Sequence, residues 1–407
     1  MSECGSGIPG EENGGMIVEG KTMGRQNDGI YGMLAREEMC ESARKLRDTY
    51  QIKPGAPLFQ REFGFLSLEL WQKEQGMPSD VPLQQLFGFE EPGNHHLGGA
   101  GWCEAGFMPP FTDEIIEDRG DYEVVRDKAG RHVLCFKGRR QGFMPEYLDH
   151  PVRDMKTWEE RCKWRLNPET PERYNNLQET LDAAKEEART GKMISQMVVG
   201  GYMYLRSLMG PEGLLYKFYD EPELINDCMK TWFELADSLI SRHQEQLTID
   251  ELFIGEDICY NKGPLISPDM IKEFLFPYYR QLICNIKSRQ LDKDRHLYFH
   301  VDTDGHAMPV IPLYQSIGMD VMSPFEVASG CDVVEMGIRF PGLAMFGGID
   351  KRILAKGKKA IDAHLDYVLP AMRKRGGYIP TCDHDVPEEV SYENYLHYRK
   401  RCLEFAK

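Results

Sequence analysis

The feature that most constrains the fold is a regular alternation of strand-like and helical segments from about residue 170 to the C-terminus. The strand-like segments are short apolar runs, and longer amphipathic stretches separate them. Repeated βα units build a parallel sheet, and their number is large enough to close it. The sequence therefore predicts an α/β fold of the (β/α)8 TIM-barrel type. The predicted strands are 193–199, 251–257, 297–301, 319–323, 343–346 and 377–380, and the predicted helices are 211–217, 221–247, 268–290 and 352–374.

The N-terminal part of the chain departs from this alternation. Residues 1–30 are rich in glycine and polar groups, which predicts a disordered tail. The segment 56–63 is predicted as the first strand of the barrel. The region 65–165 is dense in tryptophan, proline and glycine and contains a predicted β-hairpin at 122–136. We interpret this region as an insertion that covers the mouth of a single barrel domain over 31–407.

The composition limits the classes of function. Aspartate and glutamate outnumber lysine and arginine by 65 to 49, and the formal net charge is −16. Non-specific attraction to nucleic acids or anionic membranes is therefore disfavoured. The 11 cysteines include no Cys-x-x-Cys pair, which indicates a reducing, cytoplasmic location. No apolar run approaches the roughly 20 residues of a membrane-spanning helix, and the N-terminus lacks the pattern of a signal peptide.

The predicted strand 297–301 runs into a dense set of polar side chains. His300 and Asp302 point to the same face of an extended chain, and Asp304 joins them if the extension continues. In barrels, catalytic and metal-binding groups lie at the C-terminal ends of the strands. These residues therefore predict an acid/base or metal site, and the structural alternative is a strand that ends in a solvated turn.

The other predicted strands end in similar groups. A rim that is merely solvated would favour lysine, serine and asparagine over repeated aspartate, glutamate, histidine and cysteine. The recurrence of these residue types predicts a catalytic site at the rim. The five strand ends are 255–257, 300–304, 323–326, 347–350 and 381–385.

Several of these segments resemble the uroporphyrinogen decarboxylase superfamily. They are Gly255-Glu-Asp, the His-x-Asp of 300–302, Gly318-Met-Asp-Val, Gly347-Gly-Ile-Asp and Gly376-Gly-Tyr-Ile-Pro-Thr-Cys-Asp-His. The resemblance covers about residues 55–405 and implies a (β/α)8 barrel. It also implies an enzyme of either the decarboxylase branch or the branch of zinc-dependent methyltransferases that serve corrinoid proteins.

The resemblance to the methyltransferase branch implies a metal site. In that branch, zinc is held by a His-x-Cys at one strand end and a cysteine near the last strand. Here His300 matches the first ligand and Asp302 stands in place of the first cysteine. His384 matches the last ligand, with Cys382 as a substitute. Two histidines and an aspartate can hold zinc with an open position, although harder ligands also suit other divalent metals.

The decarboxylase branch carries an arginine-rich motif after its first strand, and this chain has only Arg61 there. Porphyrinogen decarboxylation is therefore disfavoured. The paired Arg139 and Arg140 either bind a substrate carboxylate or form a solvated turn. Glu326 and Asp350 are further candidate substrate-binding residues.

The resemblance thus favours a metal-dependent methyltransferase. It would demethylate a small methylated compound, such as a methyl ether, and pass the methyl group to the cobalamin-type cofactor of a separate corrinoid protein. The metal would stabilise charge on the leaving oxygen, and Glu256 or Asp383 would either protonate that oxygen or orient a metal-bound histidine. A metal-independent decarboxylase or lyase of a small carboxylic acid and a non-catalytic binding subunit are the alternatives. The candidate catalytic residues are Glu256, Asp257, Asp304 and Asp383, and the aromatic residues that either stack on substrate or fill the core are Trp71, Trp102, Phe107 and Phe111.

Overall fold

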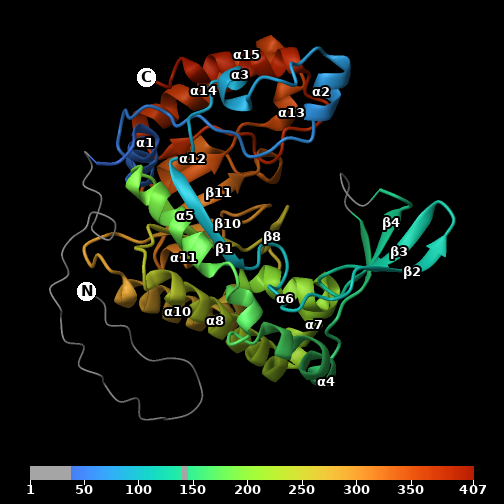
Figure 1. Ribbon diagram of the computed structural model, residues 1–407. Coiled ribbons are helices and arrows are strands. Elements are labelled where there is room, and N and C mark those ends of the chain that lie inside the picture. The colour runs from blue at the N-terminus through green and yellow to red at the C-terminus, as the bar shows by residue number, and fades with distance from the viewer. Residues whose placement is uncertain (1–37, 140–144) are drawn as a thin grey trace.

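Seven parallel strands form the centre of the protein (Figure 1). The computed structural model describes residues 38–139 and 145–407. The predicted tail at 1–30 and Arg140 lie outside these residues. Neighbouring strands are all parallel and helices connect them, so the prediction of a (β/α)8 barrel is confirmed. In sheet order the strands are β1 (Asn94–Ala100), β6 (Met193–Val199), β7 (Glu251–Gly255), β10 (Tyr298–Asp302), β11 (Met319–Phe325), β12 (Ala344–Gly347) and β13 (Tyr378–Ile379).

The segment 56–63 is not a strand, so the prediction of the first barrel strand is wrong. A proline in this segment lacks the backbone N–H that a ladder needs. The chain meets the end of the barrel at an isolated parallel bridge between Phe65 and Val386. On its other side, the Glu90 amide donates to the Gln60 carbonyl at 2.8 Å. This extended segment links the edges of the sheet without forming a ladder.

Helices surround the sheet, and the predicted helices are found with small changes in their bounds. The stretch predicted at 268–290 is one continuous helical run that contains a π-helical turn, and the stretch at 352–374 is split in two. The longer helices are α1 (Glu41–Tyr50), α5 (Leu177–Arg189), α6 (Gly201–Met209), α7 (Pro211–Asp220), α8 (Pro222–Gln244), α10 (Phe276–Arg289), α14 (Lys358–Arg375) and α15 (Tyr392–Leu403). The shorter ones are α2 (Leu68–Glu74), α3 (Leu83–Phe87), α4 (Met155–Thr157), α9 (Pro268–Met270), α11 (Ile311–Gln315), α12 (Val333–Arg339) and α13 (Lys351–Leu354).

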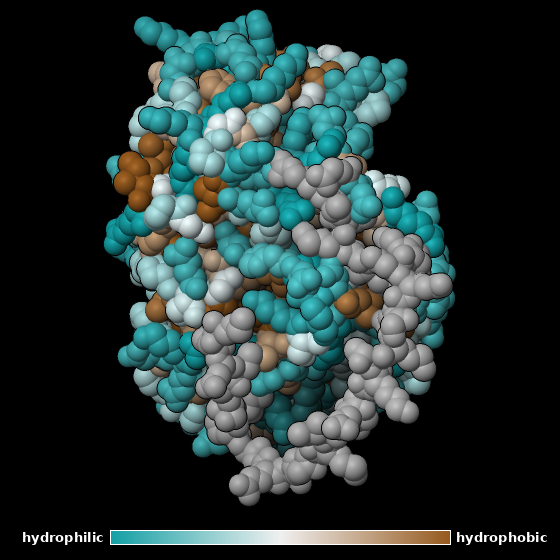
Figure 2. All heavy atoms as spheres, turned by 90° about the vertical axis from the view of Figure 1, so that its left-hand side faces the viewer, coloured by the Kyte–Doolittle hydropathy of each residue, from teal (hydrophilic) through white to brown (hydrophobic). Residues whose placement is uncertain are grey.

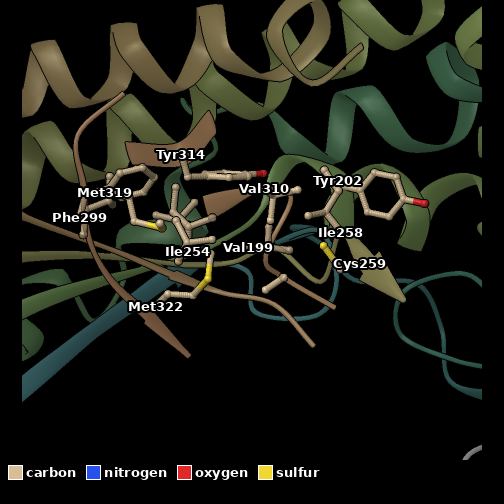
Figure 3. Packing of buried hydrophobic residues seen from close by; sticks show 14 of the residues in the cluster. Val199, Tyr202, Ile254, Ile258, Cys259, Phe299, Val310, Tyr314, Met319 and Met322 are labelled. Atoms are coloured by element: carbon tan, nitrogen blue, oxygen red, sulfur yellow. The ribbon is translucent and has the colours of Figure 1, made fainter. Parts of the chain in front are cut away.

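Alternate residues of each strand face opposite sides of the sheet, and this separates core from site. On β7 and β10, Leu252, Ile254, Phe299 and Val301 are 0–1% exposed and pack in the core between sheet and helices. Figure 3 shows Ile254 and Phe299 in this cluster together with side chains such as Met322 and Tyr314. The residues of opposite phase point into the barrel. Such burial of apolar area is the main stabilising term of the fold.

A small antiparallel sheet projects from the barrel, at the right of Figure 1. The predicted hairpin at 122–136 is confirmed as its two central strands. β1 lies inside the region predicted as an insertion. It is not predicted as a strand, because two glycines near its end weaken the sequence signal of a strand. The inserted part therefore begins only after residue 100. The strands of the small sheet are β2 (Glu114–Arg119), β3 (Tyr122–Arg126), β4 (His132–Phe136) and β5 (Glu146–Asp149).

The face shown in Figure 2 is mostly hydrophilic, and its hydrophobic atoms form small separate groups. This agrees with the composition of the chain, in which 28% of the residues are charged. Within the described ranges, none of the helices combines the length and the hydropathy needed to cross a bilayer.

Candidate active site

A pocket of about 250 Å³ lies inside the barrel. Inward-facing residues of the strands form most of its wall, and residues from outside the sheet complete it. The volume lies just below the range of about 300–1,000 Å³ that is typical of small-molecule sites. The lining residues are Tyr50, Arg61, Phe63, Asn94, His96, Trp102, Met197, Glu251, Phe253, His300, Asp302, Ser323, Phe346 and Thr381.

Four polar residues in the pocket form one continuous hydrogen-bonded chain. Glu251 Oε1 lies 2.9 Å from His300 Nδ1, and His300 Nε2 lies 2.9 Å from Ser323 Oγ. Ser323 Oγ also makes a short hydrogen bond with Asp302 Oδ2. The strand register explains the arrangement, because Asp302 pairs with Ser323 across the β10–β11 ladder. This hydrogen-bonded chain connects the carboxyl of Glu251, deep in the barrel, to the carboxyl of Asp302, nearer the C-terminal ends of the strands.

Glu251 is held by two further donors. The Tyr50 hydroxyl donates to Oε1 at 2.5 Å, and Asn94 Nδ2 donates to Oε2 at 3.1 Å. Tyr50 is the last residue of α1. Its ring makes an edge contact with the ring of Tyr298, the first residue of β10. Both oxygens of Glu251 are thus occupied by the protein itself.

The two carboxyls of this chain have opposite pKa shifts. Burial raises the pKa of Glu251, but hydrogen bonds from His300 and Tyr50 outweigh burial and bring it to about 2. Burial also raises the pKa of Asp302, and there the Ser323 bond and the His300 charge only partly offset it. Glu251 is therefore the ionised end of the chain and Asp302 the end that holds a proton more readily. Ser323 Oγ donates to Asp302 Oδ2, so Glu251 and Asp302 are the two carboxyl ends of this hydrogen-bonded chain.

Arg61 is the cation of the pocket. It is half-buried, and within the described ranges its guanidinium forms neither an ion pair nor a hydrogen bond. Its Cζ lies 5.6 Å from the centre of the Phe346 ring. A guanidinium in a pocket with no carboxylate partner is available to a ligand.

Glu62 fixes the backbone that carries Arg61. Its Oε1 accepts from the amides of Cys382 (2.7 Å) and Phe63 (3.0 Å), and its Oε2 accepts from the Tyr395 hydroxyl (2.8 Å). Arg61 and Phe63, the neighbours of Glu62 in the chain, both line the pocket. Glu62 thus joins one wall of the pocket to the loop after β13.

The structure does not assemble the predicted metal ligands. Both ring nitrogens of His300 are occupied, by Glu251 and Ser323. Cys382 is fully buried in the core, and burial raises the pKa of its thiol, which disfavours the thiolate that a metal needs. His384 does not line the pocket, and its Nδ1 accepts from the Asp385 amide. In the part of the chain that the structure describes, no three His, Cys, Asp or Glu residues are grouped to hold a metal.

The four predicted catalytic carboxylates lie outside the pocket lining. Glu256 is fully buried beside the start of α6, where it accepts from the Tyr202 amide and the Tyr279 hydroxyl. Asp257 forms an ion pair with Arg206. Asp383 accepts from the backbone amides of Val327, which begins a short 3-10 helix, and of Lys351, which begins α13. Asp304 Oδ2 lies 3.7 Å from His384 Nε2.

The other predicted substrate-binding residues also lie away from the pocket. Arg139 is exposed next to β4 of the small sheet. Glu326 accepts from the Gly305 amide and pairs with Lys351. Asp350 begins α13 and pairs with Arg352. Of the four candidate aromatic residues, Trp102 lines the pocket, whereas Trp71, Phe107 and Phe111 do not.

Arg61, His300 and Asp302 are predicted from the sequence and line the pocket, whereas Glu251 and Ser323 are pocket residues that were not predicted. Glu251 is the first residue of its strand, whereas the prediction of the site rests on the C-terminal ends of the strands. A usable signal was present, since a glutamate in a strand that is otherwise apolar must face a polar interior or a partner. Glu251 and Phe253 share a phase, which is also the phase of the pocket.

Comparisons with known proteins agree with this barrel. Residues 141–404 match the family model described as uroporphyrinogen decarboxylase. No curated protein matches the sequence of the chain. A solved methyltransferase from Methanosarcina mazei is similar in fold, with a TM-score of 0.53 and 14% identity over 90% of this chain and 99% of that chain. A proposed vitamin B12-independent methionine synthase from Listeria monocytogenes, at a TM-score of 0.28 and 13% identity over 53% of this chain and 64% of that chain, is too distant to support an inference.

Proposed function

Because this chain belongs to the uroporphyrinogen decarboxylase family, we propose that its barrel pocket is the active site of a methyltransferase. The enzyme would take a methyl group from a small methylated compound and pass it to a corrinoid protein. The similarity of fold to a methyltransferase from Methanosarcina mazei, over 99% of that chain, supports this choice of branch.

The observation that carries the proposal is the hydrogen-bonded chain from Glu251 to Asp302. A methyl ether is demethylated only if charge that develops on the leaving oxygen is neutralised, because an alkoxide is a poor leaving group. Asp302 lines the pocket, and burial raises the pKa of its carboxyl, so Asp302 is the residue that we propose supplies that proton. Ser323 donates to Asp302 and is itself bonded to His300, which is bonded to Glu251, so these three residues hold Asp302 in place.

The size of the pocket argues against a tetrapyrrole substrate. Four pyrrole rings with their carboxylates need a cavity far larger than about 250 Å³ and several cations. Arg61 is the one arginine that lines this pocket in the described ranges. Both facts favour a small substrate with few charges.

No step of this proposal uses a metal. The residues that were predicted to bind zinc do not fit a metal centre in the arrangement that they adopt. Zinc at His300, Asp302 and His384 stays a prediction that metal analysis of the protein must test. The proton from Asp302 takes the part that a Lewis acid plays in the metal-dependent reaction.

A metal-independent decarboxylase of a small carboxylic acid is the second candidate. The unpaired guanidinium of Arg61 favours it, because a carboxylate is the group that such a cation binds best. In that reaction Asp302 would protonate the carbanion that remains after carbon dioxide leaves.

One experiment separates the two candidates. The purified protein is mixed with cob(I)alamin and a panel of methyl ethers, methylamines and thioethers, and the loss of cob(I)alamin absorbance is followed. Methyl transfer from one donor supports the proposal. Release of carbon dioxide from small acids, with no methyl transfer from any donor, would support the second candidate instead.

A further inference from the structure

Part of the pocket wall is a series of aromatic rings in contact with one another. The rings of Trp102 and Phe253 stack at 5.5 Å with an angle of 26°. Phe253 then meets the edge of the His300 ring at 4.6 Å, and His300 meets Phe346 at 5.0 Å. Arg61 lies over the Phe346 ring and completes the series. Such a wall suits a flat, apolar ligand.

Arg61 adds a single positive charge to this wall. The chain has a net charge of −16, yet this guanidinium has no acidic partner in the described ranges. Its fork of donors matches the two oxygens of a carboxylate. The two acids of the pocket do not supply those oxygens, because Glu251 is bound by His300, Tyr50 and Asn94, and Asp302 is bound by Ser323.

We propose that the substrate is a single-ring aromatic carboxylate that carries its methyl group on oxygen, a methoxybenzoate. Its carboxylate would pair with Arg61, its ring would lie against the aromatic wall, and its ether oxygen would meet Asp302. This inference rests on the proposed function for the methyl group, whereas the aromatic acid is inferred from the pocket alone. A pocket of about 250 Å³ holds one such ring with its substituents.

A cationic methyl donor is the main competitor, because aromatic rings also attract ammonium groups. The positive charge of Arg61 disfavours a cationic donor. A second cation in a pocket of this size would lie close to the guanidinium and be repelled by it. Glu251 is ionised, but both of its oxygens already accept hydrogen bonds from side chains of the protein, which leaves them less available to a second cation.

The proposed reaction needs only the methyl ether, Asp302, the corrinoid protein and solvent. The bond between the methyl carbon and the ether oxygen breaks, and its electron pair stays on the oxygen. The oxygen takes a proton from Asp302 and leaves as a phenol. The methyl group, as a cation equivalent, takes an electron pair from the cobalt(I) of the corrinoid protein, and solvent returns a proton to the Asp302 carboxylate.

Binding of benzoate tests the aromatic acid without any methyl transfer. Calorimetry is run with benzoate, the uncharged benzamide and the non-aromatic acetate, on the wild type and on Arg61→Met. Benzoate should bind about tenfold or more tightly than either analogue, and Arg61→Met should lose that advantage. Arg61→Lys keeps the charge and should retain part of it. Arg161→Met, which removes an exposed arginine outside the pocket, should bind benzoate like the wild type.

Equal binding of benzoate and benzamide, or unchanged benzoate binding in a folded Arg61→Met, would overturn the proposal. Recognition of an aromatic carboxylate and transfer of methyl to a corrinoid can each fail without the other. Benzoate binding without transfer of methyl from 4-methoxybenzoate to cob(I)alamin would leave the substrate class standing and remove methyl transfer. Transfer from uncharged or cationic donors, with no benzoate binding, would leave methyl transfer standing and remove the aromatic carboxylate as the substrate class.

Discussion

Replacement of Glu256 by glutamine should change how stability depends on pH. Burial, only partly offset by hydrogen bonds from Tyr279 and Tyr202, raises the pKa of Glu256 from 4.5 to about 7. The folded protein thus holds a proton that the unfolded chain releases above its own pKa. The free energy of unfolding therefore falls as pH rises from about 4.5 to about 7, and it levels off above that range.

The size of the effect follows from the two pKa values. A difference of about 2.5 pH units corresponds to roughly 3 kcal/mol in full, of which about 2.5 kcal/mol falls between pH 5 and pH 8. Glutamine cannot titrate, so Glu256→Gln should gain about that much stability relative to the wild type over this range. Other titrating groups cancel because both proteins share them.

Urea unfolding at pH 5, 6, 7 and 8 measures this difference. Glu388→Gln, which removes one exposed carboxyl, controls for the change in net charge. A difference between Glu256→Gln and the wild type that stays constant with pH, or that shrinks as pH rises, would refute the assignment of a protonated, buried Glu256.

Three further predictions concern the pocket. Asp302→Asn should lower the rate of methyl transfer by about 10²-fold or more with substrate affinity retained, since it removes the proton donor but not the aromatic wall; an unchanged rate in a kinetic assay would exclude Asp302 as the acid. Glu62→Gln should cost about 1–3 kcal/mol of unfolding free energy and weaken benzoate binding, because it disturbs the backbone on both sides of the residue; calorimetry that finds benzoate binding intact would show that Glu62 does not position Arg61. Dialysis against a chelator should leave the rate unchanged, and elemental analysis that finds one tightly bound metal, lost in His300→Ala, would restore the predicted zinc site.

The barrel was predictable because its signals are local and repeated. The six strands predicted from 193–199 onward are all present, since each combines a short apolar run with a polar end. The first strand was misplaced because 56–63 has the composition of a strand but contains a proline. The true β1 ends in two glycines that weaken its pattern.

The site was predictable only in part, because side chains at strand ends have several places to go. His300 and Asp302 face the pocket as their alternation requires. Glu256 and Asp383 instead accept from backbone amides that follow other strands, at Tyr202 for Glu256 and at Val327 and Lys351 for Asp383, which the sequence does not reveal. Glu251 escaped notice because its partner His300 is 49 residues away and the contact depends on the register of β7 with β10.

The most direct test of the account is a single-turnover reaction with methyl ethers that carry ¹³C in the methyl group. The wild type and Asp302→Asn are each mixed with cob(I)alamin and one ether, and the products are followed by NMR. The account predicts that the wild type moves the label to cobalamin and releases an equal amount of the demethylated alcohol or phenol, whereas Asp302→Asn does so about 10²-fold more slowly or worse. Label that never reaches cobalamin from any ether, or transfer at the same rate in both proteins, would contradict it.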